Sequence, residues 1–97
     1  MPLLVLTEQA ELDLLEAQAW YDARGYGLGA AFMRSVDASF SLIERHPEVF
    51  PISRGQVRRT LLRKFPYVVL FRAADDEILI VGCLHTSRER SSWWDRS

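Results

Sequence analysis

The spacing of hydrophobic and polar residues in the first half of the chain predicts a strand followed by two helices. The apolar run Leu3–Leu6 is typical of a short strand buried on both faces. Residues 8–24 alternate at helical intervals between an apolar stripe (Ala10, Leu14, Leu15, Ala17, Trp20, Tyr21) and a solvent-facing acidic side (Glu8, Glu11, Asp13, Glu16, Asp22). A second helix is predicted over residues 28–45, where the apolar positions advance by four, four and three: Phe32, Val36, Phe40 and Ile43.

A glycine-rich segment, Gly25-Tyr26-Gly27-Leu28-Gly29, joins the two predicted helices. A Gly-x-Gly-x-Gly string can bind phosphate, but such a loop follows a strand, whereas this one follows a helix. Glycine readily adopts the backbone conformations that end helices, so we interpret the segment as a turn. Pro47 ends the second helix because proline cannot continue its hydrogen bonds. The two helices are therefore predicted to form a hairpin whose apolar stripe is covered by a sheet.

The second half of the chain is predicted to supply most of that sheet. After a loop over residues 47–55, residues 57–63 alternate imperfectly between basic and apolar side chains. Residues 67–72 are β-branched or aromatic on both faces, as expected of a central strand. Residues 78–85 form another apolar strand, joined to the previous one by a turn over residues 73–76 into an antiparallel hairpin. The predicted fold class is α+β in the order β-α-α-β-β-β, with the helical hairpin packed on a small, mainly antiparallel four-stranded sheet.

Length and composition predict one domain spanning residues 1–97, since 97 residues with 48% hydrophobic content suffice for a single core. The longest apolar runs are far shorter than the roughly 20 residues of a membrane span. The N-terminus also lacks the basic flank of a signal peptide. We therefore expect a cytoplasmic protein with no membrane partner. Cys83 is the single cysteine and lies in an apolar run, which predicts a buried free thiol. With two histidines and no second thiol, we predict no metal site and no cofactor.

The net charge of −1 hides an uneven distribution. Residues 1–48 hold eight acidic and three basic residues, whereas residues 49–97 hold five acidic and nine basic ones. No acidic residue lies between Glu48 and Asp75, and that interval contains Arg54, Arg58, Arg59, Arg63, Lys64 and Arg72. Such a stretch indicates either an anionic partner, which could be nucleic acid or an acidic protein segment, or simply a solvent-exposed strand face.

Six fragments of the chain resemble a known family when they are taken in this order and at these spacings. They are Ala10-x-x-Asp13-Leu14, the Tyr21–Gly29 turn with Phe32, Ile43-x-x-x-Pro47-x-x-Phe50-Pro51, Val57-Arg58-Arg59, Lys64-Phe65-Pro66-Tyr67-Val68-Val69, and His85-x-x-Arg88 with Trp93-Trp94. Over nearly its whole length the chain resembles the RelE/ParE superfamily of bacterial toxin–antitoxin toxins. That resemblance implies one of two activities on the same fold: RelE-like members cut mRNA in the ribosomal A site, and ParE-like members inhibit DNA gyrase. The fold cannot choose between the two, so the choice depends on the site.

Cleavage of RNA through its 2′-hydroxyl requires a base, cations beside the phosphate and an acid for the leaving oxygen. The resemblance places the five nuclease groups of RelE-like members at Arg59, Leu61, Val68, Arg88 and Trp94. Leucine and valine cannot hold a phosphate, and indole donates a hydrogen bond without transferring a proton. The sequence pI of about 6.1 is also low for a ribosome-binding nuclease. The resemblance thus favours a ParE-like, non-enzymatic gyrase inhibitor. The alternative is an mRNA endonuclease that uses Arg59, His85 and Arg88.

The predicted binding residues are basic or aromatic: Arg58, Arg59, Arg63, Arg88, Trp93 and Trp94. The two tryptophans either cover the sheet or, for one of them, anchor a partner. His85 is either a general acid or base or a structural hydrogen-bonding group. The resemblance implies a cognate antitoxin whose flexible C-terminal segment wraps the toxin and links it indirectly to operator DNA. We expect acidic residues of that segment to meet Arg58, Arg59 and Arg63, while an amphipathic helix lies along the helical hairpin. A third hypothesis is an interaction module that only binds its antitoxin.

Overall fold

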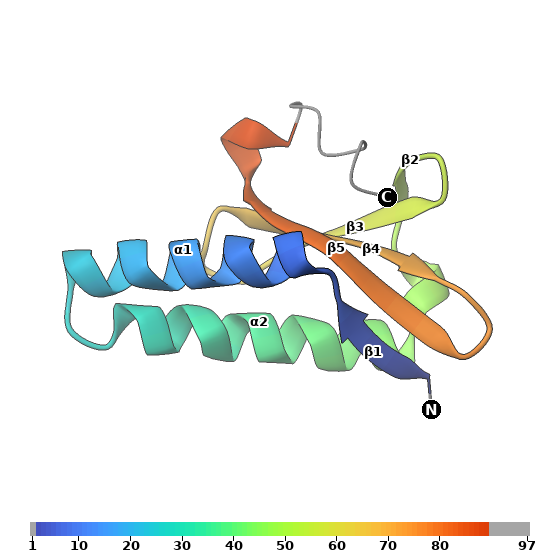
Figure 1. Cartoon of the computed structure of the whole chain (residues 1–97), viewed down its shortest axis with the longest axis horizontal. Helices are drawn as coiled ribbons and strands as arrows, with labels where there is room; N and C mark the ends of the chain where they lie inside the picture. The colour runs from blue at the N-terminus through green and yellow to red at the C-terminus, as the bar shows by residue number, and fades with distance from the viewer. Residues whose placement is uncertain (1, 90–97) are drawn as a thin grey trace.

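The computed structural model describes residues 2–89 and has two helices on a five-stranded sheet (Figure 1). The helices are α1 (Glu8–Arg24) and α2 (Leu28–Arg45), and two short 3-10 turns are η1 (Pro47–Val49) and η2 (Thr86–Arg88). The strands are β1 (Leu3–Leu6), β2 (Ile52–Arg54), β3 (Val57–Leu61), β4 (Tyr67–Ala73) and β5 (Glu77–His85). The predicted α+β class is confirmed, as are the bounds of β1 and both helices.

The strands lie in the order β1-β5-β4-β3-β2, so β4 is the central strand, as predicted. Within residues 2–89, β1 pairs in parallel with β5, and the other three pairings are antiparallel. The prediction of four strands was wrong, because β2 lies inside the segment expected to be a loop. It has three residues and an irregular register against β3. A strand this short, flanked by Pro51 and Gly55, carries too few alternating positions to be recognised.

The edge strand β1 is not buried on both faces, which corrects the prediction made from its apolar run. Leu3 is exposed, and residues 4–6 are only half-buried. A continuous apolar run does not say whether a strand lies at the centre or at the edge of its sheet.

Thr7 caps the N-terminus of α1, because its Oγ1 accepts a hydrogen bond from the Ala10 N–H at 3.0 Å. Ala10, Leu14 and Ala17 are buried as predicted. Leu15 and Trp20 are exposed, which corrects their assignment to the apolar stripe. The guanidinium carbon of Arg24 lies 3.7 Å from the Trp20 ring centroid, a cation–π contact on the surface. The helix buries a narrower stripe than its apolar residues suggested.

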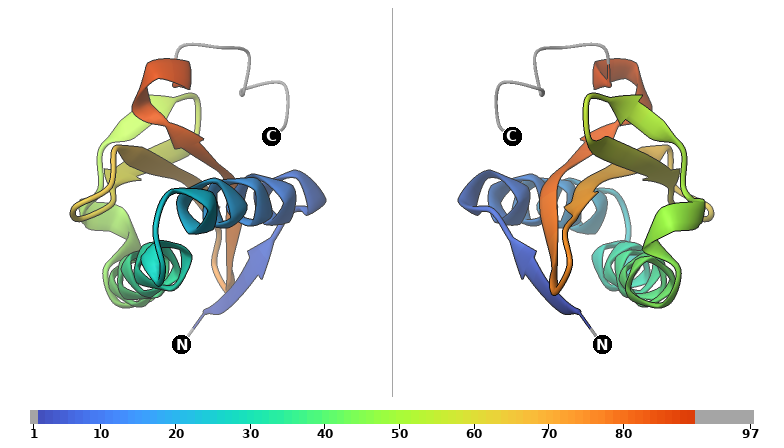
Figure 2. Two further views of the ribbon diagram at one scale, coloured as in Figure 1. Left: turned by 90° about the vertical axis from the view of Figure 1, so that its left-hand side faces the viewer. Right: turned by 90° about the vertical axis from the view of Figure 1, so that its right-hand side faces the viewer.

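The glycine segment forms the predicted turn between helices that lie side by side (Figure 2). Gly27 has φ of +79°, in the left-handed region that glycine adopts without strain. Gly29 lies in the first turn of α2, and its N–H donates to Asp22 Oδ1 at 3.0 Å. A Cβ atom at Gly29 would overlap the Asp22 carboxylate, so a larger residue there would displace this side chain and its hydrogen bond.

The main core lies between the helical hairpin and one face of the sheet. Phe32, Val36 and Ile43 from α2 join Ala10, Leu14 and Ala17 from α1 against sheet residues that include Val69, Phe71, Ile80 and Cys83. Cys83 is buried and free, as predicted. Successive residues of a strand point to opposite faces, so Val68 and Leu70 belong to a second cluster with Val57, Val81 and Leu84. The sheet is therefore buried on both faces around β4 and β5.

Candidate functional site

The structure does not gather the three arginines of the predicted basic strand into one surface. Strand β3 ends at Leu61, so Arg63 lies in the β3–β4 turn (residues 62–66) rather than on the strand. Arg58 and Arg59 are adjacent on β3 and point to opposite faces. Arg58 Nη1 donates to the Phe50 carbonyl at 2.7 Å and so fastens the segment before β2. Only Arg63 of the three is fully on the surface.

Arg59 forms a two-pronged ion pair with Glu89. Its Nη2 donates to Glu89 Oε1 at 2.9 Å, and its Nε donates to Glu89 Oε2. This hydrogen bonding raises the pKa of Arg59 above its ordinary value, against an opposing effect of burial. The pair joins β3 to the residue after η2, and it neutralises the charge of Arg59.

His85 and Arg88 do lie together, in a small polar cavity of about 120 Å³ beside the end of β5. Its other lining residues are Asp13, Glu16, Ala17, Trp20, Tyr67 and Cys83. His85 Nδ1 accepts the Ser87 N–H at 3.1 Å, which caps η2 and places the ring proton of the neutral imidazole on Nε2. The His85 ring also packs edge-on against Tyr67, whose pKa is raised chiefly by burial. Arg59 does not line this cavity, so the three residues of the nuclease alternative are not brought into one pocket.

Asp13 was predicted to face solvent, and this was wrong: the residue is 7% exposed and lines the same cavity. Its Oδ2 accepts the Cys83 N–H at 3.1 Å, and Gln9 Nε2 donates to Oδ1 at 3.3 Å. The carboxylate thus accepts a hydrogen bond from a β5 backbone N–H that lies beyond Ile80, the last β5 residue paired with β1. Burial, helped by the nearby Asp13 charge, raises the pKa of the Cys83 thiol to about 12. Cys83 therefore stays protonated near neutral pH and is no nucleophile.

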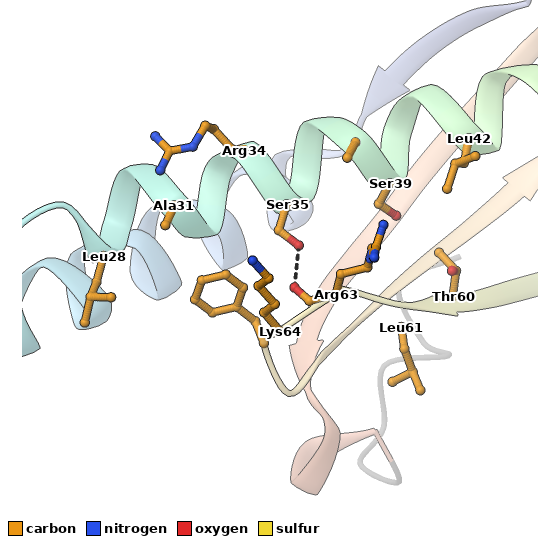
Figure 3. Close-up of a pocket in the computed structure, with 12 residues that line it drawn as sticks. Leu28, Ala31, Arg34, Ser35, Ser39, Leu42, Thr60, Leu61, Arg63 and Lys64 are labelled. Atoms are coloured by element: carbon orange, nitrogen blue, oxygen red, sulfur yellow. Dashed lines mark hydrogen bonds between the residues drawn. The ribbon is translucent and has the colours of Figure 1, made fainter.

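A larger groove of about 600 Å³ lies between α2 and the β3–β4 turn (Figure 3). We call it the α2 groove and define it by its lining residues: Leu28, Ala31, Arg34, Ser35, Ala38, Ser39, Leu42, Thr60, Leu61, Arg63, Lys64 and Phe65. Ser35 Oγ donates to the Arg63 carbonyl at 2.8 Å and holds the turn against the helix. Sequence reasoning missed this groove, because its two walls are far apart in the chain. One signal was present: Leu28 and Leu42 are apolar but lie off the core stripe of α2.

Comparison with known families matches residues 4–90 to the model described as "ParE toxin of type II toxin-antitoxin system, parDE". The chain belongs to the ParE toxin family. It is thus the toxin component of a type II toxin–antitoxin system, with an antitoxin as its partner. A comparison with curated proteins found no match.

A solved structure titled "Chromosomal ParDE TA system from P. aeruginosa" has the same fold as this ParE-family chain. The TM-score is 0.64 at 21% sequence identity, over 88% of this chain and 96% of that chain. The predicted placement in the RelE/ParE superfamily, nearer the ParE branch, is confirmed. Among residues 2–89 of this ParE-family chain, no helix is long and apolar enough to cross a membrane.

Two of the positions that differ from RelE-like nucleases lie in contrasting surroundings in this ParE-family toxin. Leu61 is 54% exposed and lines the α2 groove, whereas Val68 is 0% exposed within the second core cluster. Trp94 and its neighbour Trp93, the predicted binding pair of which one was expected to anchor a partner, lie outside the described residues.

The buried carboxylate of Asp13 is expected to be important for the stability of this ParE-family fold. Asp13→Ala leaves the Cys83 N–H buried without an acceptor, which should lower the free energy of unfolding by about 2–3 kcal/mol. Asp13→Asn keeps an acceptor oxygen and should lower the free energy of unfolding clearly less than Asp13→Ala does. Urea unfolding followed by circular dichroism measures both. Glu16→Ala, an exposed change on the same helix, is the control and should stay within about 0.5 kcal/mol. An Asp13→Ala loss no larger than the control would contradict the role given to this carboxylate.

Proposed function

We propose that this ParE-family toxin inhibits DNA gyrase without being a ribonuclease, and that its cognate antitoxin neutralises it. The observation that carries the proposal is the state of the nuclease positions: Arg59 is held by Glu89, and Val68 is buried in an apolar cluster. Phosphate cleavage needs cations aimed at the phosphate as charge develops. The Arg59 guanidinium uses its Nε and one terminal nitrogen to bind the Glu89 carboxylate. It is therefore poorly placed to stabilise charge on a phosphate.

The surroundings of His85 also support a role outside catalysis. Its Nδ1 accepts a backbone N–H, which is a structural use of the ring. The cavity beside it measures about 120 Å³, whereas small-molecule sites usually offer at least about 300 Å³. A nucleotide therefore has little room next to His85 and Arg88.

Membership of the ParE branch supports the remaining parts of the proposal. The toxin acts in the cytoplasm, where gyrase is found, and needs neither a metal nor a cofactor. It reaches operator DNA only through its antitoxin. The surface arginine Arg63 and Arg88, which lines the small cavity, remain predicted contacts with the target or the antitoxin.

The test is to add the purified chain in parallel to a gyrase supercoiling assay and to a translating ribosome system. Inhibited supercoiling with intact mRNA is the expected result, and premixing with the product of the neighbouring open reading frame should relieve it. Cleavage of mRNA at codon positions with unaffected supercoiling would overturn the proposal, and so would no effect in either assay.

A matched variant, His85→Asn, sharpens this comparison. Asparagine retains an acceptor that can cap η2 but cannot transfer a proton near neutral pH. The variant should inhibit supercoiling as well as the unaltered chain does. A ribonuclease that depends on His85 would instead lose its mRNA cleavage.

A further inference from the structure

We propose that this chain forms a symmetric dimer in which the β1 strands of two copies pair antiparallel at the edges of their sheets. The inference goes beyond the proposed function, because it concerns the purified chain alone and holds whatever the toxin inhibits. Three features carry it: the direction of the backbone groups of β1, its uncharged apolar side chains, and the contrast with β2 at the other edge of the sheet. We call the side of residues 2–6 that faces away from β5 the β1 edge.

The β1 edge carries backbone groups that no strand of the described residues pairs with. The sheet order places β1 at one end, with β5 on its single paired side (Figure 1). The N–H groups of Leu3 and Thr7 point toward β5, because they donate to carbonyl groups of residues 76 and 80 at 2.9 and 3.0 Å. Backbone groups alternate in direction along a strand, so the N–H and C=O groups of Leu4 and Leu6 point away from β5. The Pro2 carbonyl does so too, since it shares a planar peptide with the Leu3 N–H.

The side chains of β1 are apolar on both faces of the sheet and carry no charge. Leu4 and Leu6 pack against the main core on the helix side and are half-buried. Leu3 and Val5 point to the opposite face, where Val5 lies beside Leu79 of β5. Leu3 is 66% exposed. Native proteins guard edge strands against edge-to-edge pairing with charged side chains, prolines or bulges, and none of these occurs within β1.

The opposite edge of the sheet, at β2, is guarded by several of these devices. β2 has three residues, and its register against β3 shifts between Ile52 and Arg54. Pro51 precedes the strand, and Arg54 places a charge at its exposed end. A strand added to β2 would therefore meet an irregular ladder and a cation. Of the two edges, β1 is the one suited to strand addition.

A second copy of this chain supplies a strand that matches the β1 edge. In an antiparallel pair with its two-fold axis at Leu4, each Leu4 N–H meets the partner's Leu4 carbonyl, and each Leu6 N–H meets the partner's Pro2 carbonyl. Proline has no N–H, and at this position its carbonyl alone is needed. Leu3 of each copy then lies opposite the partner's Val5, so the exposed leucine gains an apolar neighbour. Because the strand carries no charge, it can pair with itself without repulsion.

The position and the size of the β1 edge define what the dimer should do. No residue of the β1 edge lines the α2 groove or the cavity beside His85, so pairing through β1 does not occupy either of them. A strand of four residues gives a contact smaller than the roughly 1,200–2,000 Å² of a standard stable interface. We therefore expect reversible association, with a Kd of about 1–100 μM.

The first test measures the association of the purified chain by sedimentation velocity across and above this concentration range. Leu3→Lys places a cation at the contact and should weaken dimerisation at least about 10-fold. Leu3 is exposed, so the unfolding midpoint of the variant should be unchanged. Ile52→Lys makes the same change of charge at an exposed leucine-sized residue of β2 and should leave dimerisation unchanged. A chain that stays monomeric throughout, or equal losses for the two variants, would overturn the proposal.

The second test examines the register through a disulfide across the two-fold axis. Facing residues of a hydrogen-bonded antiparallel pair have Cα atoms about 5.5 Å apart, which a disulfide can span, so Leu4→Cys should cross-link two copies in a thiol–disulfide buffer. Leu6→Cys is the control on the same face, because it would lie about 14 Å from its counterpart and should not cross-link. The native Cys83 is buried and should not react. Cross-linking of neither variant, or of Leu6→Cys as readily as Leu4→Cys, would contradict the proposed pairing.

Another occupant of the β1 edge would give a different pattern of results. If the product of the neighbouring open reading frame pairs with β1 instead, the purified chain stays monomeric and Leu3→Lys weakens its binding to that product, which overturns the dimer. Failure of the dimer is also distinguishable from failure of the proposed function. A chain that dimerises without inhibiting gyrase sinks only the proposed function, whereas a monomeric chain that inhibits gyrase sinks only the dimer.

Discussion

Replacing Phe32 by alanine is expected to lower the free energy of unfolding by about 3–5 kcal/mol. The side chain is fully buried, and its ring packs against Tyr21, Phe65 and Tyr67 with centroids 5.1–5.4 Å apart. Alanine would remove apolar burial, leave a cavity and break these aromatic contacts. Since a domain of this size is stable by only about 5–15 kcal/mol, the variant should be close to unfolding.

Urea unfolding followed by tryptophan fluorescence measures this loss. Tyr26→Ala is the matched control, because Tyr26 is an aromatic residue of the same helical hairpin but is fully exposed. It should change the free energy of unfolding by no more than about 0.5 kcal/mol. A similar, small loss in both variants would show that the aromatic cluster does not stabilise the hairpin on the sheet.

The first and last residues of both helices were predicted correctly because the sequence next to each helix end marks where it begins or stops. Thr7 caps α1, glycines fill the turn to α2, and Pro47 follows the end of α2. Each signal acts over a few residues, so it can be read without knowing the rest of the fold. Strand β2 has no such signal, because three residues become a strand only through their pairing with β3.

The surroundings of Arg59 and Asp13 could not be predicted, because each side chain bonds a residue far away in the sequence. Arg59 and Glu89 are 30 positions apart, and Asp13 and the Cys83 N–H are 70 apart. Neither pair can be inferred from spacing, since both depend on the register of the sheet and on how α1 packs against it. One available signal was not used: adjacent strand residues face opposite sides, so Arg58 and Arg59 could not share one surface.

The α2 groove could not be predicted from the sequence either, because it also forms between segments that are far apart in the chain. Its walls are α2 and the β3–β4 turn, fastened by a hydrogen bond between residues 28 positions apart. Arg34 and Ser39 had no reason to be singled out on a helix read only for its apolar stripe. Arg63 was singled out for its charge, but its position beside α2 came only from the folded chain.

Restoring the nuclease arginine at position 68 is expected to unfold the domain. Val68 is fully buried against Val57, Leu70, Val81 and Leu84. A guanidinium placed there would lose its hydration without gaining a partner, since every neighbour in that cluster is apolar. Val68→Arg should therefore lower the free energy of unfolding by about 4–5 kcal/mol or more, enough to unfold a domain at the lower end of the usual stability range.

The matched control is Leu61→Arg, which restores the other missing basic residue at an exposed position. It should change the free energy of unfolding by no more than about 0.5 kcal/mol. Circular dichroism during urea unfolding distinguishes the two variants directly. A folded Val68→Arg protein as stable as Leu61→Arg would mean that this face of the sheet can accept a cation, and the ribonuclease alternative would then regain support. If instead Val68→Arg unfolds and Leu61→Arg does not, the second core cluster cannot accommodate the arginine that RelE-like nucleases place at position 68.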